Sequence, residues 1–239
     1  MYTEGRMAQL IIALDAPDRD RALALVDRLG SGAGYYKVGL ELFSRWGPEA
    51  VTTLRARGKR IFLDLKLHDI PNTVAGAVRS ATALGVDLLT VHAAGGPRMM
   101  EAAVKAAREA GPDGPRILAV TLLTSMDTRE VAEVWGRQVE ATGDEVVRLA
   151  RLAREVGVDG VVASPLEARA LREALGTDAL LVTPGIRLAD GPRHDQRRVS
   201  TPEAAIRAGA DHLVVGRTVT ADPDPEAALV RVRRSMEAA

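Results

Sequence analysis

Two oppositely charged residues, Asp64 and Lys66, alternate with leucines in residues 61–67, which read IFLDLKL. Alternate side chains of a β-strand point to opposite faces, so we expect both charges on the face of Phe62 and the leucines on the other face. A buried charge is costly unless it is paired, so the pattern requires an explanation. It indicates either an ion pair that fixes the strand register or a site where a lysine ammonium donates a proton.

Three more charges are expected near this pair. Asp15 follows the apolar run IIAL, Lys37 lies in YYKVGL, and Asp69 lies in the loop after residue 67. The charges from Lys37 to Asp69 alternate in sign, Lys–Asp–Lys–Asp, and the partner of Asp69 need not belong to the same chain. Convergence of several charges favours a functional site over an ion pair that only fixes register.

Eight short runs of β-branched residues or leucines recur along the chain and predict eight strands. The segments between them have helical spacing of apolar residues, as in residues 19–29 and 144–156, and many end in glycine. Such alternation is typical of a parallel sheet covered by helices. The predicted strands are residues 10–14, 35–40, 61–67, 88–92, 117–123, 160–163, 180–183 and 212–215.

The length of 239 residues is close to the roughly 250 that are typical of a closed barrel of eight such units. We therefore predict an α/β protein with one domain over residues 1–239, a single (β/α)8 TIM barrel. Residues 1–7 would be an extension if Met7 is the native start. An open, doubly wound sheet is the alternative.

Gly216 and Arg217 follow the eighth predicted strand, where barrels of this kind often bind phosphate through the N–H groups of a helix N-terminus. A guanidinium at this point can hold an oxyanion with two hydrogen bonds. Taken alone, Gly-Arg is a weak signal that is more typical of an exposed surface arginine than of a phosphate site. The proximity of Arg187, after the seventh strand, favours a phosphate site.

Two predicted connections exceed the usual length of about 2–6 residues. Residues 125–143 are expected to include a short helix. Residues 188–200 read LADGPRHDQRRVS, with three arginines, and we expect them to close over an anion.

The composition excludes several classes of protein. Lys plus Arg and Asp plus Glu number 32 each, so no overall field attracts nucleic acid or an anionic membrane. The chain has no cysteine, which excludes disulfides, thiol nucleophiles and cysteine-ligated metals. The first apolar run is too short for a membrane span or a signal peptide. We expect a cytoplasmic protein that binds its anionic ligand at a local site.

Residues 64–73, DLKLHDIPNT, resemble the signature of bacterial orotidine 5′-phosphate decarboxylases. The resemblance covers residues 10–220. It implies a decarboxylase without metal or cofactor that converts orotidine 5′-phosphate to uridine 5′-phosphate, the last step of de novo UMP synthesis, on a homodimer with shared active sites. The other matching segments are ALD (13–15), KVGLELF (37–43), VHAAGG (91–96), VTLLTS (120–125), TPGIR (183–187), DQRR (195–198) and VVGR (214–217).

The resemblance also implies a role for each matching residue. Lys66 would protonate C6 of the pyrimidine as carbon dioxide leaves, and Asp64 would lie against the departing carboxylate. Lys37 and Asp69 would complete the network, with Asp69 supplied by the neighbouring subunit. The implied substrate-binding residues are Asp15 and Lys37 at the ribose, Thr124 at the base, Gln196 between base and phosphate, Arg187, Gly216 and Arg217 at the phosphate, Ile70 and Thr73 from the neighbouring subunit, and Pro184.

The chain departs from the family pattern at His194 and Arg197, where we expect an acidic residue and a lysine. Neither residue is expected to touch the chemistry. We interpret His194 as a solvated loop residue, and an effect of the two changes on closure of residues 188–200 is the alternative. His68 and His92 are expected to pack beside the site without acting in it.

Two other functions remain open. Magnesium-dependent 3-keto-L-gulonate 6-phosphate decarboxylases and hexulose phosphate synthases share the Asp-x-Lys-x-x-Asp motif but carry a metal-ligating glutamate in the second strand. This chain has Lys37 there, and a charged ammonium cannot ligate a cation. The remaining alternative is a non-catalytic barrel that binds a pyrimidine nucleotide.

Overall fold

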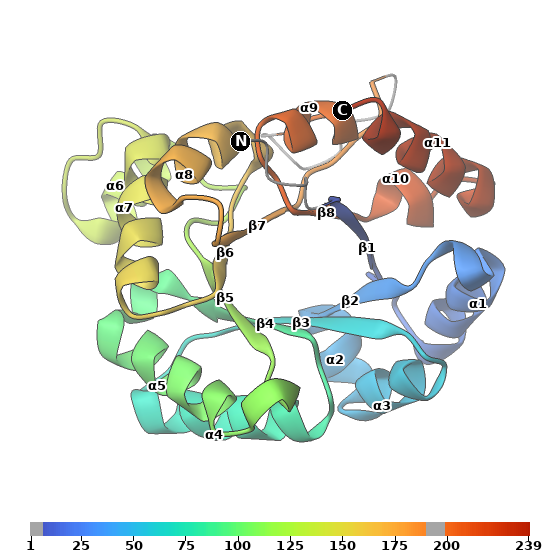
Figure 1. Cartoon of the computed structure of the whole chain (residues 1–239), viewed down its shortest axis with the longest axis horizontal. Coiled ribbons are helices and arrows are strands. Elements are labelled where there is room, and N and C mark those ends of the chain that lie inside the picture. Colours follow the sequence, from blue (N-terminus) through green and yellow to red (C-terminus); the bar gives the residue numbers. More distant parts are fainter. Residues whose placement is uncertain (1–6, 190–198) are drawn as a thin grey trace.

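The computed structural model describes residues 7–189 and 199–239 and shows eight parallel strands in a closed barrel. Each strand pairs with the next, and β8 closes the barrel against β1 (Figure 1). The prediction of a barrel is therefore confirmed, and the open sheet is wrong. The strands are β1 (Gln9–Ala13), β2 (Tyr35–Gly39), β3 (Arg60–Leu67), β4 (Leu88–His92), β5 (Arg116–Val120), β6 (Gly160–Val162), β7 (Leu180–Thr183) and β8 (His212–Val215).

Helices form the outer layer around the strands (Figure 1). Their starts follow from local sequence: the side chains of Asp18, Thr201 and Asp224 cap helices by accepting backbone N–H groups, and proline opens several others. The helices are α1 (Arg19–Leu29), α2 (Leu40–Trp46), α3 (Glu49–Ala56), α4 (Pro71–Ala83), α5 (Pro97–Arg108), α6 (Thr128–Trp135), α7 (Thr142–Glu155), α8 (Ala168–Leu175), α9 (Pro202–Arg207), α10 (Arg217–Thr220) and α11 (Pro225–Glu237), with short 3-10 turns at Gly30–Gly32, Ala93–Gly95, Gly111–Asp113 and Pro165–Glu167.

Two apolar layers hold the fold together. The larger lies between strands and helices and includes Ile61 and Leu63. The smaller fills the barrel interior and includes Phe62, so β3 alternates between the two layers as its sequence predicts. The interior cluster consists of Ile11, Ala13, Tyr35, Phe62, Leu88, Leu118, Val120, Val162, Leu180, Val182 and Val214.

A Gly-x-Asp motif precedes β4, β6 and β8, and its aspartates are Asp87, Asp159 and Asp211. Each carboxylate accepts the N–H of a residue at the start of the preceding strand, at 2.8, 2.8 and 2.7 Å for Ile61, Ile117 and Leu181. Each aspartate N–H donates to the carbonyl of the same partner. These three carboxylate clamps fasten the end of the barrel at which the strands begin.

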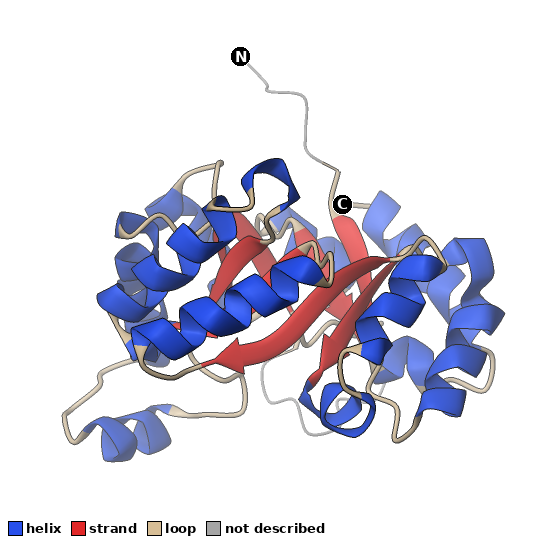
Figure 2. Ribbon diagram, turned by 90° about the horizontal axis from the view of Figure 1, so that it is seen from below, coloured by secondary structure: helices blue, strands red, loops and turns tan. Residues whose placement is uncertain are grey.

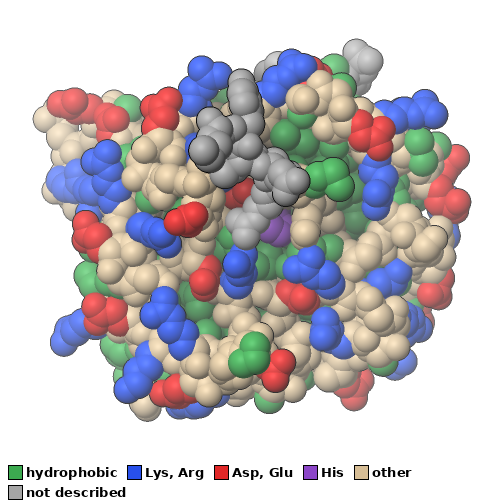
Figure 3. All heavy atoms as spheres, viewed as in Figure 1, with side chains coloured by type: hydrophobic (Ala, Val, Ile, Leu, Met, Phe, Trp, Pro, Cys, Tyr) green, Lys and Arg blue, Asp and Glu red, His purple; other side chains and the backbone are tan. Residues whose placement is uncertain are grey.

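The strands end together at the opposite end, where the arrowheads gather at the bottom of Figure 2. Figures 1 and 3 show the face at which the strands begin, and charges of both signs are interspersed over it. Among the residues that the structure describes, no helix is long and apolar enough to cross a membrane.

The predicted short helix in residues 125–143 is confirmed as α6, which begins with a capping box between Asp127 and Glu130. Arg137, after the end of α6, donates to the buried carboxylate of Glu145 in α7. Burial raises the pKa of Glu145, but hydrogen bonds from Arg148 and Arg137 outweigh this and hold it below its usual value. This ion pair fastens the α6 connection to the body of the barrel.

Candidate functional site

A cavity of about 240 Å³ opens at the carboxyl ends of the strands. Its floor is apolar and includes Phe62, Val120 and Val214, while its rim is charged. Most of the residues predicted to form the site line this cavity. They are Asp15, Lys37, Asp64, Lys66, Thr124, Pro184, Arg187, Gly216 and Arg217.

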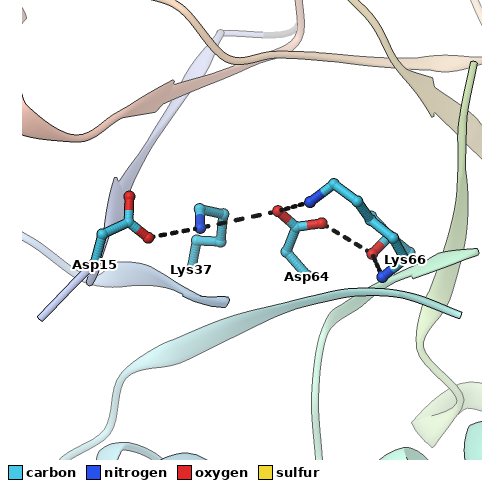
Figure 4. A network of polar contacts seen from close by, with 5 residues as sticks. Asp15, Lys37, Asp64 and Lys66 are labelled. Atoms are coloured by element: carbon cyan, nitrogen blue, oxygen red, sulfur yellow. Dashed lines mark hydrogen bonds and ion pairs between the residues drawn. The ribbon is translucent and has the colours of Figure 1, made fainter. Parts of the chain in front are cut away.

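Four of these residues form a row of alternating charges across β1, β2 and β3 (Figure 4). The ammonium of Lys37 lies 3.0 Å from Asp15 Oδ1 and 3.8 Å from Asp64 Oδ2. Lys66 Nζ lies 2.9 Å from the same Asp64 oxygen. Asp64 is 8% exposed, so its charge is compensated by both lysines and not by bulk water. The predicted pairing of Asp64 with the two lysines is thus confirmed in geometry.

Space for the Lys37 ammonium depends on Gly39, two residues further along the chain. A Cβ at Gly39 would lie 2.8 Å from Lys37 Nζ and 3.6 Å from Asp15 Oδ1. The φ of Gly39 is −98°, which any residue can adopt, so the absence of a side chain is what matters here.

A bulge in β3 places the proton-donor candidate. Between Leu63 and Leu67, β3 advances four residues while β4 advances only two, from Leu89 to Val91. Lys66 lies in this bulge with a φ of 49°, in the left-handed region that side chains rarely adopt. Such a conformation costs about 1–3 kcal/mol and persists only where surrounding contacts hold it. Strict alternation predicted the face of Lys66 but not this conformation.

Thr90 holds the bulge from β4 and was not predicted as a site residue. Its hydroxyl accepts the N–H of Lys66 at 2.8 Å and donates to Asp64 Oδ1 at 3.0 Å. The residue is 0% exposed and lies behind the charges, outside the lining of the cavity. The sequence signal was weak, because a threonine in LLTVH is what any buried strand would contain.

The phosphate side of the cavity combines the ends of β7 and β8. The hydroxyl of Thr218 donates to the carbonyl of Ile186 at 3.1 Å, which ties α10 to the end of β7. Arg187 is 7% exposed and donates through Nη1 to the same carbonyl at 2.8 Å. Its Nε has no partner among the described residues. Burial lowers the pKa of Arg187, and the positive charge of Arg217 lowers it further. An anion between these two guanidiniums would relieve both effects.

The residues expected to reach a neighbouring subunit lie outside the cavity described above. Asp69 is exposed, and its Oδ1 accepts the N–H of Ile70 at 2.6 Å. Ile70 is 68% exposed, an unusual environment for a large apolar side chain. Asp69 and Thr73 line a separate depression beside α4, which Lys66 also contacts. Asp69 therefore does not join the row of charges within one chain.

Two histidines stack beside this depression, as expected of residues that pack near the site. The rings of His68 and His92 lie 5.4 Å apart at 18°. His92 Nδ1 accepts the N–H of Ala94. Burial lowers the pKa of His92, and the charges of His68 and Lys66 lower it further.

Residues 190–198 lie outside the described part of the chain, so the predictions for Gln196, His194 and Arg197 stay predictions. The described residues on the two sides of this segment are held together: Ser200 pairs with Ile186, and the N–H of Arg187 donates to Ser200 O at 2.9 Å. Residues 187 and 200 therefore meet at the phosphate side of the cavity.

The chain resembles known proteins over nearly its full length. Residues 8–232 match the model of the orotidine 5′-phosphate decarboxylase / HUMPS family. The orotidine 5′-phosphate decarboxylase of Moorella thermoacetica is 52% identical over 235 residues, which cover 96% of this chain and 92% of the relative. That of Synechocystis sp. is 51% identical over 224 residues, covering 94% and 96%. The crystal structure of the decarboxylase from Lactobacillus acidophilus superposes with a TM-score of 0.85 at 36% identity, covering 96% of this chain and 99% of the other.

Proposed function

The chain belongs to the orotidine 5′-phosphate decarboxylase / HUMPS family, and we propose that it converts orotidine 5′-phosphate to uridine 5′-phosphate and carbon dioxide. This carboxy-lyase reaction is the last step of de novo UMP synthesis. The observation that carries the proposal is the row of alternating charges from Asp15 to Lys66, which lies across an otherwise apolar cavity.

Lys37 favours this reaction over the magnesium-dependent sugar-phosphate chemistry considered above. The second strand of those enzymes carries a carboxylate ligand, whereas here an ammonium lies between Asp15 and Asp64. It neutralises the carboxylates that would attract a divalent cation and repels the cation itself.

The chemistry follows from the position of Lys66. Loss of carbon dioxide leaves an electron pair on C6 of the pyrimidine, and no electron sink spreads that charge. A fixed ammonium beside C6 stabilises the developing carbanion and then donates the proton that replaces the carboxylate. The Asp64 carboxylate holds this ammonium and faces the substrate carboxylate, which adds repulsion that is relieved as carbon dioxide leaves.

The remaining predicted residues would orient the substrate. We assign Asp15 and Lys37 to the ribose hydroxyls, Thr124 and Pro184 to the base, and Gln196 to base and phosphate. The phosphate would lie between Arg187 and Arg217, against the N–H of Gly216. The buried guanidinium of Arg187 supports this assignment. Burial has taken it out of water, and the negative charge of a phosphate would stabilise its positive charge and accept a hydrogen bond from its Nε.

We propose that the enzyme works as a homodimer in which Asp69, Ile70 and Thr73 complete the neighbouring site. The exposure of Asp69 and Ile70 supports this assignment, since both would gain partners in a dimer. Asp69 would then extend the row of charges beyond Lys66 and hold its ammonium from the other side.

The first test is the absorbance change of orotidine 5′-phosphate with purified protein in excess EDTA. Rapid formation of uridine 5′-phosphate would establish substrate, reaction and independence from divalent metal together. No conversion, or conversion only after magnesium is added, would contradict the proposal. Tight binding of uridine 5′-phosphate without turnover would instead support a non-catalytic barrel.

A further inference from the structure

We propose that Thr90 is a positioning residue whose hydroxyl fixes the position and orientation of the Lys66 ammonium. The inference rests on the proposed decarboxylation and deepens it, because it identifies what holds the proton donor in place. Thr90 lies behind the charged row and outside the cavity lining, so it acts through Asp64 and Lys66 and not on the substrate.

The bulge in β3 creates the need for such a residue. Residues between Leu63 and Leu67 have no regular partners on β4, so the N–H of Lys66 cannot join the ladder of hydrogen bonds between the strands. A buried N–H group without a partner is strongly unfavourable. Thr90 lies between Leu89 and Val91 on β4, opposite the bulge, and its hydroxyl accepts this N–H at 2.8 Å.

The direction of the second hydrogen bond follows from the first. A backbone N–H can only donate, so the Thr90 oxygen accepts from Lys66 and its own proton remains free. Asp64 Oδ1 lies 3.0 Å away and receives that proton. The other carboxylate oxygen, Oδ2, accepts from Lys66 Nζ at 2.9 Å. One hydroxyl thus joins the backbone of Lys66 to the carboxylate that holds the tip of the same side chain.

This arrangement fixes Lys66 at both ends. The left-handed backbone conformation sets the direction in which the Lys66 side chain leaves the strand, and the ion pair with Asp64 fixes the position of its ammonium. Thr90 contacts both determinants. Without its hydroxyl, Asp64 Oδ1 loses its hydrogen-bond donor, and the bulge loses the contact that compensates for its strain.

Another buried threonine provides a matched control. Thr183 in β7 is 2% exposed, and its hydroxyl lies 3.4 Å from the carbonyl of His212. That carbonyl is the only hydrogen-bond partner of the Thr183 hydroxyl among the described residues. Thr183→Val removes a buried hydroxyl from a barrel strand as Thr90→Val does, but it leaves the hydrogen bonds of Asp64 and Lys66 intact.

The experiment compares Thr90→Val, Thr90→Ser and Thr183→Val with the wild type. For each we would measure kcat and KM for orotidine 5′-phosphate, the dissociation constant of uridine 5′-phosphate and the unfolding temperature. We expect Thr90→Val to lower kcat about 100-fold, the size of effect produced by a displacement near 1 Å. KM and product affinity should stay within about threefold, because the phosphate and ribose contacts are untouched. Thr90→Ser should restore kcat to within about threefold, and Thr183→Val should not change it.

If Thr90→Val does not fold, the comparison uses Thr90→Ser and Thr90→Cys. These two variants differ only in whether the side chain carries an oxygen or a sulfur atom. A thiol is a much weaker donor and acceptor, so kcat of the Cys variant should be clearly the lower of the two. Equal loss in Val and Ser variants, equal kcat in Ser and Cys variants, or wild-type kcat in Thr90→Val would overturn the proposal. A wild type that fails to decarboxylate orotidine 5′-phosphate would overturn the proposed function together with it, whereas an active wild type isolates the role of Thr90.

Discussion

The ammonium of Lys66 lies 2.9 Å from Oδ2 of Asp64, a carboxylate two residues earlier in the same strand. Side chains two apart in a strand share a face, but a long side chain reaches back to its neighbour only if the backbone allows it. The bulge and the left-handed φ of Lys66 provide this geometry.

Shared active sites can be tested by mixing two inactive variants. Lys66→Ala should lower kcat about a thousandfold or more, because it removes the proton donor, and Asp69→Asn should also impair the enzyme. If Asp69 serves the neighbouring subunit, each mixed dimer contains one intact site. Unfolding and refolding an equal mixture should then restore about a quarter of wild-type activity, as random pairing of the subunits requires. Activity no higher than the sum of the separate variants would contradict a shared site.

Gly39→Ala should lower kcat/KM by up to about 100-fold with little loss of stability. The added Cβ would lie 2.8 Å from Lys37 Nζ, so the ammonium at the end of this flexible side chain must move away from Asp15 and Asp64. Steady-state kinetics test the expected loss of kcat/KM, and the unfolding temperature tests the expected retention of stability. Gly34→Ala, at a position with open space before the same strand, should leave kcat/KM unchanged.

Arg217→Ala should lower kcat/KM for orotidine 5′-phosphate by roughly 10- to 100-fold, the usual contribution of a charge-assisted hydrogen bond. The loss should vanish with orotidine, which lacks the phosphate that Arg217 is assigned to hold. The measurement is kcat/KM of the wild type and of Arg217→Ala, each with orotidine 5′-phosphate and with orotidine. A similar loss with orotidine would mean that Arg217 acts on another part of the ligand.

Acid should destabilise the protein through His92. Its pKa is lowered in the folded state, so the unfolded chain binds the proton more readily. The free energy of unfolding therefore falls as the pH decreases below about 6.5, by at most about 1.4 kcal/mol per pH unit for this one group. Urea unfolding at pH 7.5 and 5.5 should show a smaller loss for His92→Asn than for the wild type. Equal losses in both proteins would assign the effect to other groups.

The carboxylate clamps predict a stabilising substitution. Gly34 occupies the position before β2 that Asp87, Asp159 and Asp211 occupy before β4, β6 and β8, and a Cβ there meets nothing within 4 Å. Gly34→Asp should add about 1 kcal/mol to the free energy of unfolding, through a new hydrogen bond to the start of β1 and a less flexible unfolded chain. Gly34→Ala separates the second effect from the first. Urea unfolding that ranks Asp no higher than Ala would show that no clamp has formed.

Much of the fold could be predicted because it depends on local pattern. Alternation in residues 61–67 placed Phe62 inside the barrel and Asp64 and Lys66 toward its mouth, as observed. Strand ends were less exact: β5 ends at Val120, three residues before its predicted end, because the apolar run continues into the loop.

The bulge and Thr90 could not be predicted in the same way. The register of β3 depends on its pairing with β4, and nothing in IFLDLKL marks where two extra residues are accommodated. Thr90 gains its significance only from that pairing. The Gly-x-Asp motif was not singled out from the sequence, because its hydrogen-bond partners lie about 26 to 42 residues away and are known only from the fold.

The clamps also reveal a symmetry of the barrel. They recur at every second strand, so the repeating unit at this end is a β–α–β–α quarter and not a single strand with its helix. Each clamp joins the two strands of its own quarter, and the carbonyl of its aspartate accepts an N–H from the first strand of the next quarter. The molecule is thus built as four β–α–β–α modules, of which the first, with Gly34, lacks the carboxylate. Circular permutants that open the chain between quarters should keep every clamp intact, whereas those that cut within a quarter separate a clamp from its partner.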